Sequence, residues 1–279
     1  MVKKCFNRAV SKRVHLLVLL LVILLVTVFP PHASAEELGE QMILDNEYAK
    51  ITFLGLQPSI GIQGYFVDFE IENKTNSKIQ VSLSECFVNN YMCSSGFSGM
   101  YITPGNAAKD RFLLPTALAY ETVYNIGFRL SIEDKATWED VYESEPIIVT
   151  VNDEYTDSQI PPAISVPAPI IDNEYVCIAY LSAQKLDGIN GRDLFFHIEN
   201  KTENRIFVSI EDSAMNGYMC DAVTSDCMKI TGHNRSIAGY LFHTFDDIDQ
   251  VTDMEYRFVI YDDDTQEVLF ESELFKMES

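Results

Sequence analysis

An internal repeat, spaced by 127 residues, constrains the architecture of this 279-residue chain more than any other feature. When residues 44–93 are laid over residues 171–220 without gaps, 23 of the 50 positions are identical. Unrelated segments would match at roughly one position in fifteen to twenty, so the similarity indicates a duplication. The sequence therefore predicts two copies of one structural unit.

Apolar and polar residues alternate within each copy, which is typical of antiparallel strands with one buried face. Roughly seven short strands in about 110 residues favour an immunoglobulin-like antiparallel β-sandwich for each copy. We therefore predict an all-β chain of two tandem immunoglobulin-like β-sandwiches that follow a signal peptide. The alternating apolar residues are Val67, Phe69 and Ile71 in the first copy and Leu194, Phe196 and Ile198 in the second.

The later strands of the two copies align only with small gaps, which we expect to fall in loops. The expected strands are 110–114, 125–132 and 141–151 in the first copy, and 236–243, 256–261 and 267–275 in the second. We align Phe128 and Leu130 with Phe258 and Ile260 at an offset of 130, and residues 142–145 with residues 270–273 at an offset of 128.

Residues 1–35 have the pattern of a secretory signal peptide, with cleavage after Ala35. Five basic residues precede an uncharged run at 16–29, and small residues follow at 33–35. The run is short for a membrane span, which needs roughly 17–25 residues. We expect a secreted protein without membrane contact after cleavage; the alternative is an uncleaved N-terminal anchor.

A proline-rich segment at 153–170 separates the two copies, and it is expected to form an extended, semi-rigid linker. This places the first repeat at 40–152 and the second at 171–277. Each repeat is long enough to bury a core of its own.

The chain is strongly acidic, and signal cleavage would change its formal net charge from -22 to -27 because five basic and no acidic residues leave. Nucleic acid and anionic lipid are poor partners for such a surface. Acidic clusters at 246–249 and 262–264 could offer oxygen ligands to calcium, but the loop pattern of a calcium site is incomplete. We expect no metal site and no cofactor.

The motifs Asp-Asn-Glu-Tyr at 45–48, Ile-Glu-Asn-Lys-Thr at 71–75 and Asn-Gly-Tyr-Met at 216–219 resemble an uncharacterised immunoglobulin-like repeat. That repeat occurs in exported and membrane-anchored proteins of Gram-positive bacteria. The resemblance covers both copies, implies the same β-sandwich fold and implies no catalytic residues.

Asn216 and Gly217 form the preferred dipeptide of a two-residue hairpin turn, in which both residues need positive φ. Asn89 and Asn90 occupy the same place in the first copy and predict the same turn.

This turn register sets Cys86 opposite Cys93, within the distance that a disulfide can span. In the second copy a serine replaces the first cysteine, so we expect Cys220 to pair with Cys227. Cys177 falls on the outward phase of its strand, and we expect it to be unpaired and partly exposed. It could then link two chains as a dimer; the alternative is a bridge between Cys177 and Cys220.

The mature histidines, His197, His233 and His243, all lie in the second copy. We expect them on the surface or in loops, because His197 takes the place of Glu70 on the polar phase of its strand. We therefore expect no enzyme and no catalytic residues. The predicted function is an extracellular module that binds or adheres to a protein or glycan at the cell exterior; the alternative is a structural spacer without a specific ligand.

Overall fold

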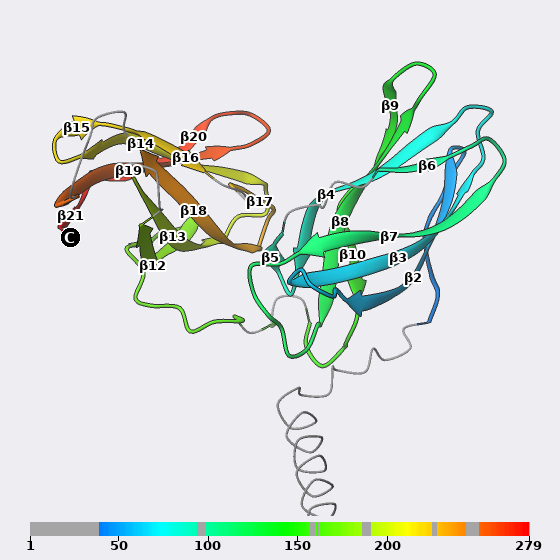
Figure 1. Cartoon of the computed structure of the whole chain (residues 1–279), viewed down its shortest axis with the longest axis horizontal. Coiled ribbons are helices and arrows are strands. Elements are labelled where there is room, and N and C mark those ends of the chain that lie inside the picture. The colour runs from blue at the N-terminus through cyan, green and yellow to red at the C-terminus, as the bar shows by residue number, and fades with distance from the viewer. Residues whose placement is uncertain are drawn as a thin grey trace, which may run out of the picture. The chain divides into compact units, whose positions relative to one another are not determined.

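The computed structural model describes residues 39–93, 99–156, 160, 162–185, 191–224, 228–243 and 251–278, which form an all-β protein (Figure 1). No helix occurs in this described part of the chain, so none of its elements has the length and apolarity of a membrane-spanning helix. The predicted signal peptide and its cleavage site after Ala35 lie outside the described residues.

Two layers of antiparallel strands enclose the core of the N-terminal half, defined here as residues 40–152. One layer runs in the order β1 (Gln41–Asp45), β2 (Ala49–Pro58), β3 (Gly64–Asn73) and β7 (Ala107–Pro115). The other contains β4 (Ile79–Val88), β5 (Tyr91–Met92), β6 (Met100–Ile102), β8 (Asn125–Asp134), β9 (Glu139–Glu143) and β10 (Ile147–Thr150).

The C-terminal half, residues 171–277, repeats this order of pairing. Its first layer contains β11 (Ile171–Asp172), β12 (Val176–Lys185), β13 (Gly191–Asn200), β18 (Arg235–His243) and β16 (Asp221–Thr224). Its second layer contains β14 (Ile206–Met215), β15 (Tyr218–Met219), β17 (Lys229–Ile230), β19 (Asp253–Asp262), β20 (Val268–Glu271) and β21 (Phe275–Glu278).

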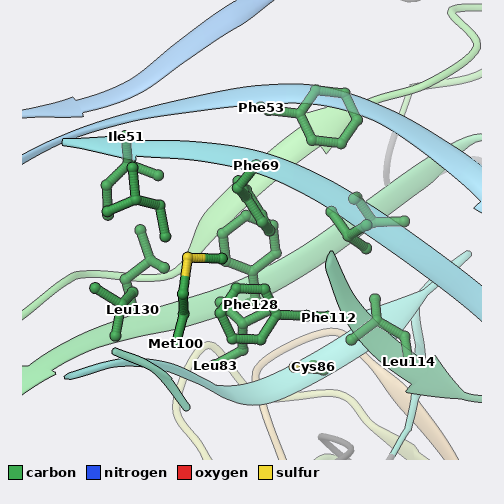
Figure 2. Packing of buried hydrophobic residues seen from close by; sticks show 14 of the residues in the cluster. Ile51, Phe53, Phe69, Leu83, Cys86, Met100, Phe112, Leu114, Phe128 and Leu130 are labelled. Atoms are coloured by element: carbon green, nitrogen blue, oxygen red, sulfur yellow. The ribbon is translucent and has the colours of Figure 1, made fainter. Parts of the chain in front are cut away.

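A phenylalanine in the middle of each half organises its apolar core. In the N-terminal half the ring of Phe69 meets those of Phe112 and Phe128 edge-on, with centroids 5.7 and 5.5 Å apart (Figure 2). Phe196 has the equivalent place in the C-terminal half, and its centroid lies 5.1 Å from that of Phe258. Burying such a side chain contributes about 1.5–3 kcal/mol, so these rings stabilise the contact between the layers.

Two of the expected long strands are each broken into two. The segment 141–151 divides between β9 and β10, and 267–275 divides between β20 and β21. The hydroxyl of Ser144 accepts a hydrogen bond from the N–H of Leu130 at 2.9 Å, and Ser272 does the same for Phe258 at 3.0 Å. The serine hydroxyl thus replaces one of the two main-chain hydrogen bonds at the break, and the other, from the serine N–H to the Leu130 or Phe258 carbonyl at 2.9 Å, is kept.

The predicted offset of 130 between the later strands is wrong. Leu83 pairs with Leu130, and Ile210, which lies 127 residues after Leu83, pairs with Phe258. Leu130 therefore corresponds to Phe258 at an offset of 128. A shift of two residues leaves the same side chains on the buried face, so alternation alone could not reveal the error.

Candidate functional site

The motifs shared by both halves hold the backbone together. Asn73 donates from Nδ2 to the carbonyls of Ser77 at 2.7 Å and Ile102 at 3.0 Å, while its Oδ1 accepts from the N–H and hydroxyl of Thr75. Asn200 makes the same contacts with Asn204, Ile230 and Thr202. Lys74 pairs with Asp45, as Lys201 pairs with Asp172. These side chains are engaged by contacts within their own half and stabilise the fold.

Both predicted hairpin turns are present in the structure. Asn89 and Asn90 have φ of 52° and 63°, and Asn216 and Gly217 have φ of 50° and 77°. Asn89 Oδ1 accepts from the N–H of Tyr124 at 2.7 Å, and Asn216 Oδ1 accepts from that of Thr252 at 2.8 Å. Each turn is thus anchored to the start of a neighbouring strand in the same way.

The two hairpins nevertheless differ in their surroundings. Tyr91 and Met92, which follow the first turn, are 2% and 8% exposed. Tyr218 and Met219, at the same positions of the second hairpin, are 56% and 72% exposed. The local structure is shared, so the difference comes from what covers the first hairpin.

The first hairpin is covered by the C-terminal half. The hydroxyl of Tyr91 lies 3.2 Å from Nε2 of His197, and the guanidinium carbon of Arg235 lies 5.8 Å from the centre of the tyrosine ring. The N–H of Arg235 donates to the carbonyl of Asn90 at 2.7 Å. Met92 belongs to the apolar cluster of the C-terminal half, where Thr231 donates its hydroxyl to the sulfur at 3.5 Å.

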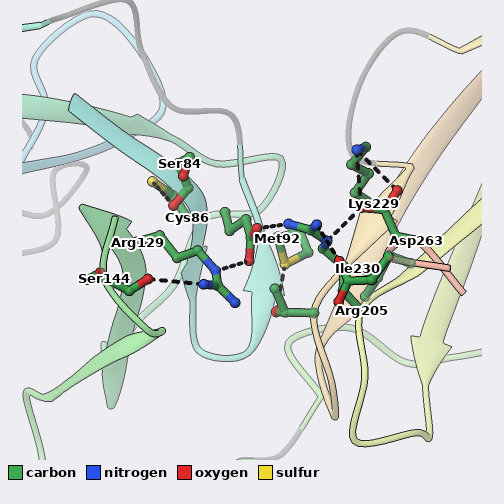
Figure 3. A network of polar contacts seen from close by, with 12 residues as sticks. Ser84, Cys86, Met92, Arg129, Ser144, Arg205, Lys229, Ile230 and Asp263 are labelled. Atoms are coloured by element: carbon green, nitrogen blue, oxygen red, sulfur yellow. Dashed lines mark hydrogen bonds and ion pairs between the residues drawn. The ribbon is translucent and has the colours of Figure 1, made fainter. Parts of the chain in front are cut away.

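A charged network continues this contact (Figure 3). The carboxylate of Glu85 pairs with Arg129 of its own half at 2.8 Å and with Arg205 of the C-terminal half. Arg205 also lies 2.6 Å from Asp263, whose second oxygen pairs with Lys229 at 3.1 Å. The contact therefore joins an apolar tip to a flanking set of ion pairs, which is the usual composition of a protein–protein interface.

His197 is buried, at 2% exposure, so its expected surface location is wrong. It does lie on the polar phase of β13, but Tyr91 covers that face, and a single strand's pattern carries no sign of a distant cover. Burial, with a smaller effect from the Arg235 charge, lowers the pKa of His197 from 6.5 to about 4. The imidazole is therefore neutral at neutral pH, and its Nδ1 has no hydrogen-bond partner within the described residues.

The first pair of cysteine candidates lies side by side in the first hairpin. The N–H of Cys93 donates to the carbonyl of Cys86 at 2.8 Å, and both residues are buried. The thiol of Cys86 lies 3.6 Å from the carbonyl of Ser84. No disulfide occurs among the described cysteines, so the bridge between these two remains a prediction.

The other cysteine candidates lie in the C-terminal half. The N–H of Cys220 donates to the carbonyl of Ser213 at 3.0 Å, and the hydroxyl of Ser213 donates to the carbonyl of Cys220 at 2.6 Å. Cys227, the expected disulfide partner of Cys220, is outside the described residues. Cys177 is half-buried on β12, opposite Asp172 and Glu199. Burial, reinforced by Asp172, raises the pKa of the Cys177 thiol.

The acidic cluster at 262–264 is engaged by the protein itself. Asp262 accepts from the N–H groups of Asp264 at 3.1 Å and Thr265 at 2.9 Å, and Asp263 holds the ion pairs described above. The cluster at 246–249 lies outside the described residues. Across the described part of the chain, no group of three or more histidine, cysteine or acidic side chains is arranged to hold a metal ion.

Comparison with known proteins gives no assignment. No family model matches the chain, and no curated protein matches it. A conserved domain protein from Bacillus anthracis is 8% identical with a TM-score of 0.30, over 88% of this chain and 93% of that one. The chaperone YadV is 10% identical with a TM-score of 0.23, over 77% and 92%. Similarity at these TM-scores carries no argument about family or function.

Proposed function

We propose that the chain is a secreted, non-enzymatic protein of two tandem immunoglobulin-like β-sandwiches that binds a protein partner outside the cell. The order β2-β3-β7 facing β10-β8-β4 supports this fold, because it matches the ABE and GFC layers of immunoglobulin domains. The signal-peptide pattern at 1–35 and the resemblance to an exported immunoglobulin-like repeat support the location. The use of the duplicated motifs for internal hydrogen bonds supports a role without catalysis.

The exposed hairpin at 216–219 is the proposed binding element. The observation that carries this proposal is the exposure of Tyr218 and Met219 at positions where Tyr91 and Met92 are buried against protein. Tyrosine and methionine are enriched in the buried centres of interfaces, where they contribute large contact areas. A protein partner is favoured over a glycan because the equivalent first hairpin binds a protein surface.

The second candidate is a structural spacer. It is favoured by the buried contact between the first hairpin and the C-terminal half, which would hold two sandwiches at a set separation without any ligand. A spacer does not require the exposed apolar tip of the second hairpin, so the tip separates the two functions.

Capture from a cell-surface extract tests the proposal. Residues 36–279 are immobilised as wild type, as Tyr218→Ser with Met219→Ser, and as the control Val268→Ser, which removes an apolar side chain of 55% exposure on another strand. We expect at least one protein to be retained by the wild type and the control and lost from the double variant. Identical capture by all three proteins would contradict a binding role for the hairpin and favour the spacer.

A further inference from the structure

We propose that the partner of the exposed hairpin is a second copy of this chain, bound head-to-tail through the N-terminal half of that copy. This inference rests on the proposed function of the hairpin and adds the identity of its partner. It starts from the contact inside one chain, in which the tip of the first hairpin packs on a face of the C-terminal half. We call the hairpin tip the donor surface, or donor, and the face that receives it the acceptor surface, or acceptor.

A chain of two equivalent units leaves one donor and one acceptor unused. The unused donor is the second hairpin, with Tyr218 and Met219 exposed. The unused acceptor is the face of the N-terminal half that corresponds to His197, Arg205 and Thr231. Counting back 127 residues for the first two and 128 for the third gives Glu70, Lys78 and Thr103.

The acceptor face of the N-terminal half is open in the structure. Lys78 and Thr103 are exposed, and the side chain of Glu70 is 41% exposed. The corresponding residues of the C-terminal half, His197 and Thr231, are buried by the first hairpin. The donor surface of the C-terminal half and the acceptor surface of the N-terminal half are therefore both uncovered.

The chemistry of the internal contact can be reproduced between two copies. The Tyr218 hydroxyl can donate to the Glu70 carboxylate, in place of the contact between Tyr91 and His197. Met219 can meet Thr103 as Met92 meets Thr231.

The ion pair of the internal contact also has an equivalent. Asp212 corresponds to Glu85; both have φ of 49°, and Asp212 lies 3.3 Å from Arg257 as Glu85 lies beside Arg129. Lys78 replaces Arg205 as the cation across the contact and rests 4.7 Å from the ring centre of Tyr101. The carboxylate of Asp212 would therefore meet an exposed ammonium group.

One internal contact has no equivalent, because Ala107 stands at the position of Arg235 and offers no cation to the tyrosine ring. The internal contact also gains from its covalent connection, which raises the effective concentration of the two surfaces. The contact between copies is accordingly weaker than the internal one. Its donor and acceptor surfaces differ, so it adds copies in a row rather than closing a two-fold dimer.

Sedimentation velocity of residues 36–279 over rising concentration tests the inference, with Cys177→Ser present in every protein, the wild type included, to exclude a disulfide-linked dimer. The wild type is expected to form larger species as concentration rises. Lys78→Glu damages the acceptor, Tyr218→Ser with Met219→Ser damages the donor, and each variant alone is expected to sediment as a monomer. An equimolar mixture of the two retains one intact donor and one intact acceptor, so it should form a dimer and nothing larger. Lys50→Glu, on the exposed side of β2, is the control for the charge change and should associate like the wild type.

The outcomes separate this inference from the function on which it rests. A wild type that stays monomeric at every concentration overturns self-association, and capture of another protein through the hairpin would still uphold the binding role. Association lost in the hairpin variant but kept in Lys78→Glu places the acceptor elsewhere and overturns the inference. Association unaffected by both variants contradicts the inference and the role of the hairpin together. Melting curves of the variants that match the wild type exclude misfolding as the cause of lost association.

Discussion

The buried imidazole of His197 should make the contact between the halves sensitive to mild acid. Its pKa falls from 6.5 to about 4 because Tyr91 and the surrounding strands remove it from water, and the charge of Arg235 adds to the effect. Glu199 lies 3.7 Å from Arg235 and partly offsets that charge. An unfolded chain binds the histidine proton near pH 6.5, whereas the folded chain binds it only near pH 4.

The direction of the effect follows from this difference. The stabilisation from a neutral His197 is complete above the unfolded pKa and is lost as the pH falls from 6.5 towards 4. Between about pH 7.5 and about pH 5 the free energy of unfolding should drop by about 2 kcal/mol from this group. If the first hairpin leaves the C-terminal half before that half unfolds, the drop in the free energy of unfolding cannot exceed the free energy with which the hairpin docks.

Urea unfolding of the wild type, His197→Gln and His233→Gln at both pH values measures this drop. Glutamine does not titrate but can still bond to the Tyr91 hydroxyl, so His197→Gln should lose about 2 kcal/mol less than the wild type on acidification. His233 is exposed and paired with Glu203, and its variant should follow the wild type. Hydrogen exchange at the Arg235 amide, which bonds to Asn90, reports release of the hairpin. Parallel losses in all three proteins would refute a buried, neutral His197.

Three further outcomes are expected. Asn200→Ala removes the donor to the buried carbonyl of Ile230 and to the carbonyl of Asn204, and should lower the free energy of unfolding by about 1–3 kcal/mol, measured by urea unfolding; an unchanged midpoint would mean that water replaces the side chain. Non-reducing peptide mapping of the secreted protein should link Cys86 to Cys93, and a Cys86 peptide joined to another cysteine would contradict the hairpin register. In air-saturated buffer, where dissolved oxygen is the oxidant, two chains should join through a Cys177 disulfide that reductant cleaves; the raised pKa of the thiol makes this slow at neutral pH and faster at alkaline pH, and disulfide-linked dimers persisting in Cys177→Ser would exclude this route.

Local patterns were sufficient to predict the all-β class and both hairpin turns. Alternation shows which face of a strand is buried, and the turn dipeptides require positive φ, so each signal lies within a few residues. The offset between Leu130 and Phe258 was missed because a shift of two residues preserves that alternation. The location of His197 was missed because its cover, Tyr91, lies 106 residues earlier in the chain.

The sequence does not single out the second hairpin as the candidate site, for a related reason. Tyr91 and Tyr218 belong to the same shared motif, so the sequence gives them the same role. Only the docking of one hairpin distinguishes them. One difference between the copies was visible in the sequence, because an imidazole at His197 stands where the first copy has a carboxylate at Glu70.

Docking of the first hairpin also orders the steps by which the chain can complete its fold. The N-terminal half emerges first during synthesis, and Phe87, Tyr91 and Met92 stay uncovered until the strand that begins at Arg235 has emerged. A chain truncated before Arg235 should keep this apolar tip open and bind a hydrophobic dye that the full chain excludes. Docking of the C-terminal half is thus expected to protect this tip of the N-terminal half from aggregation.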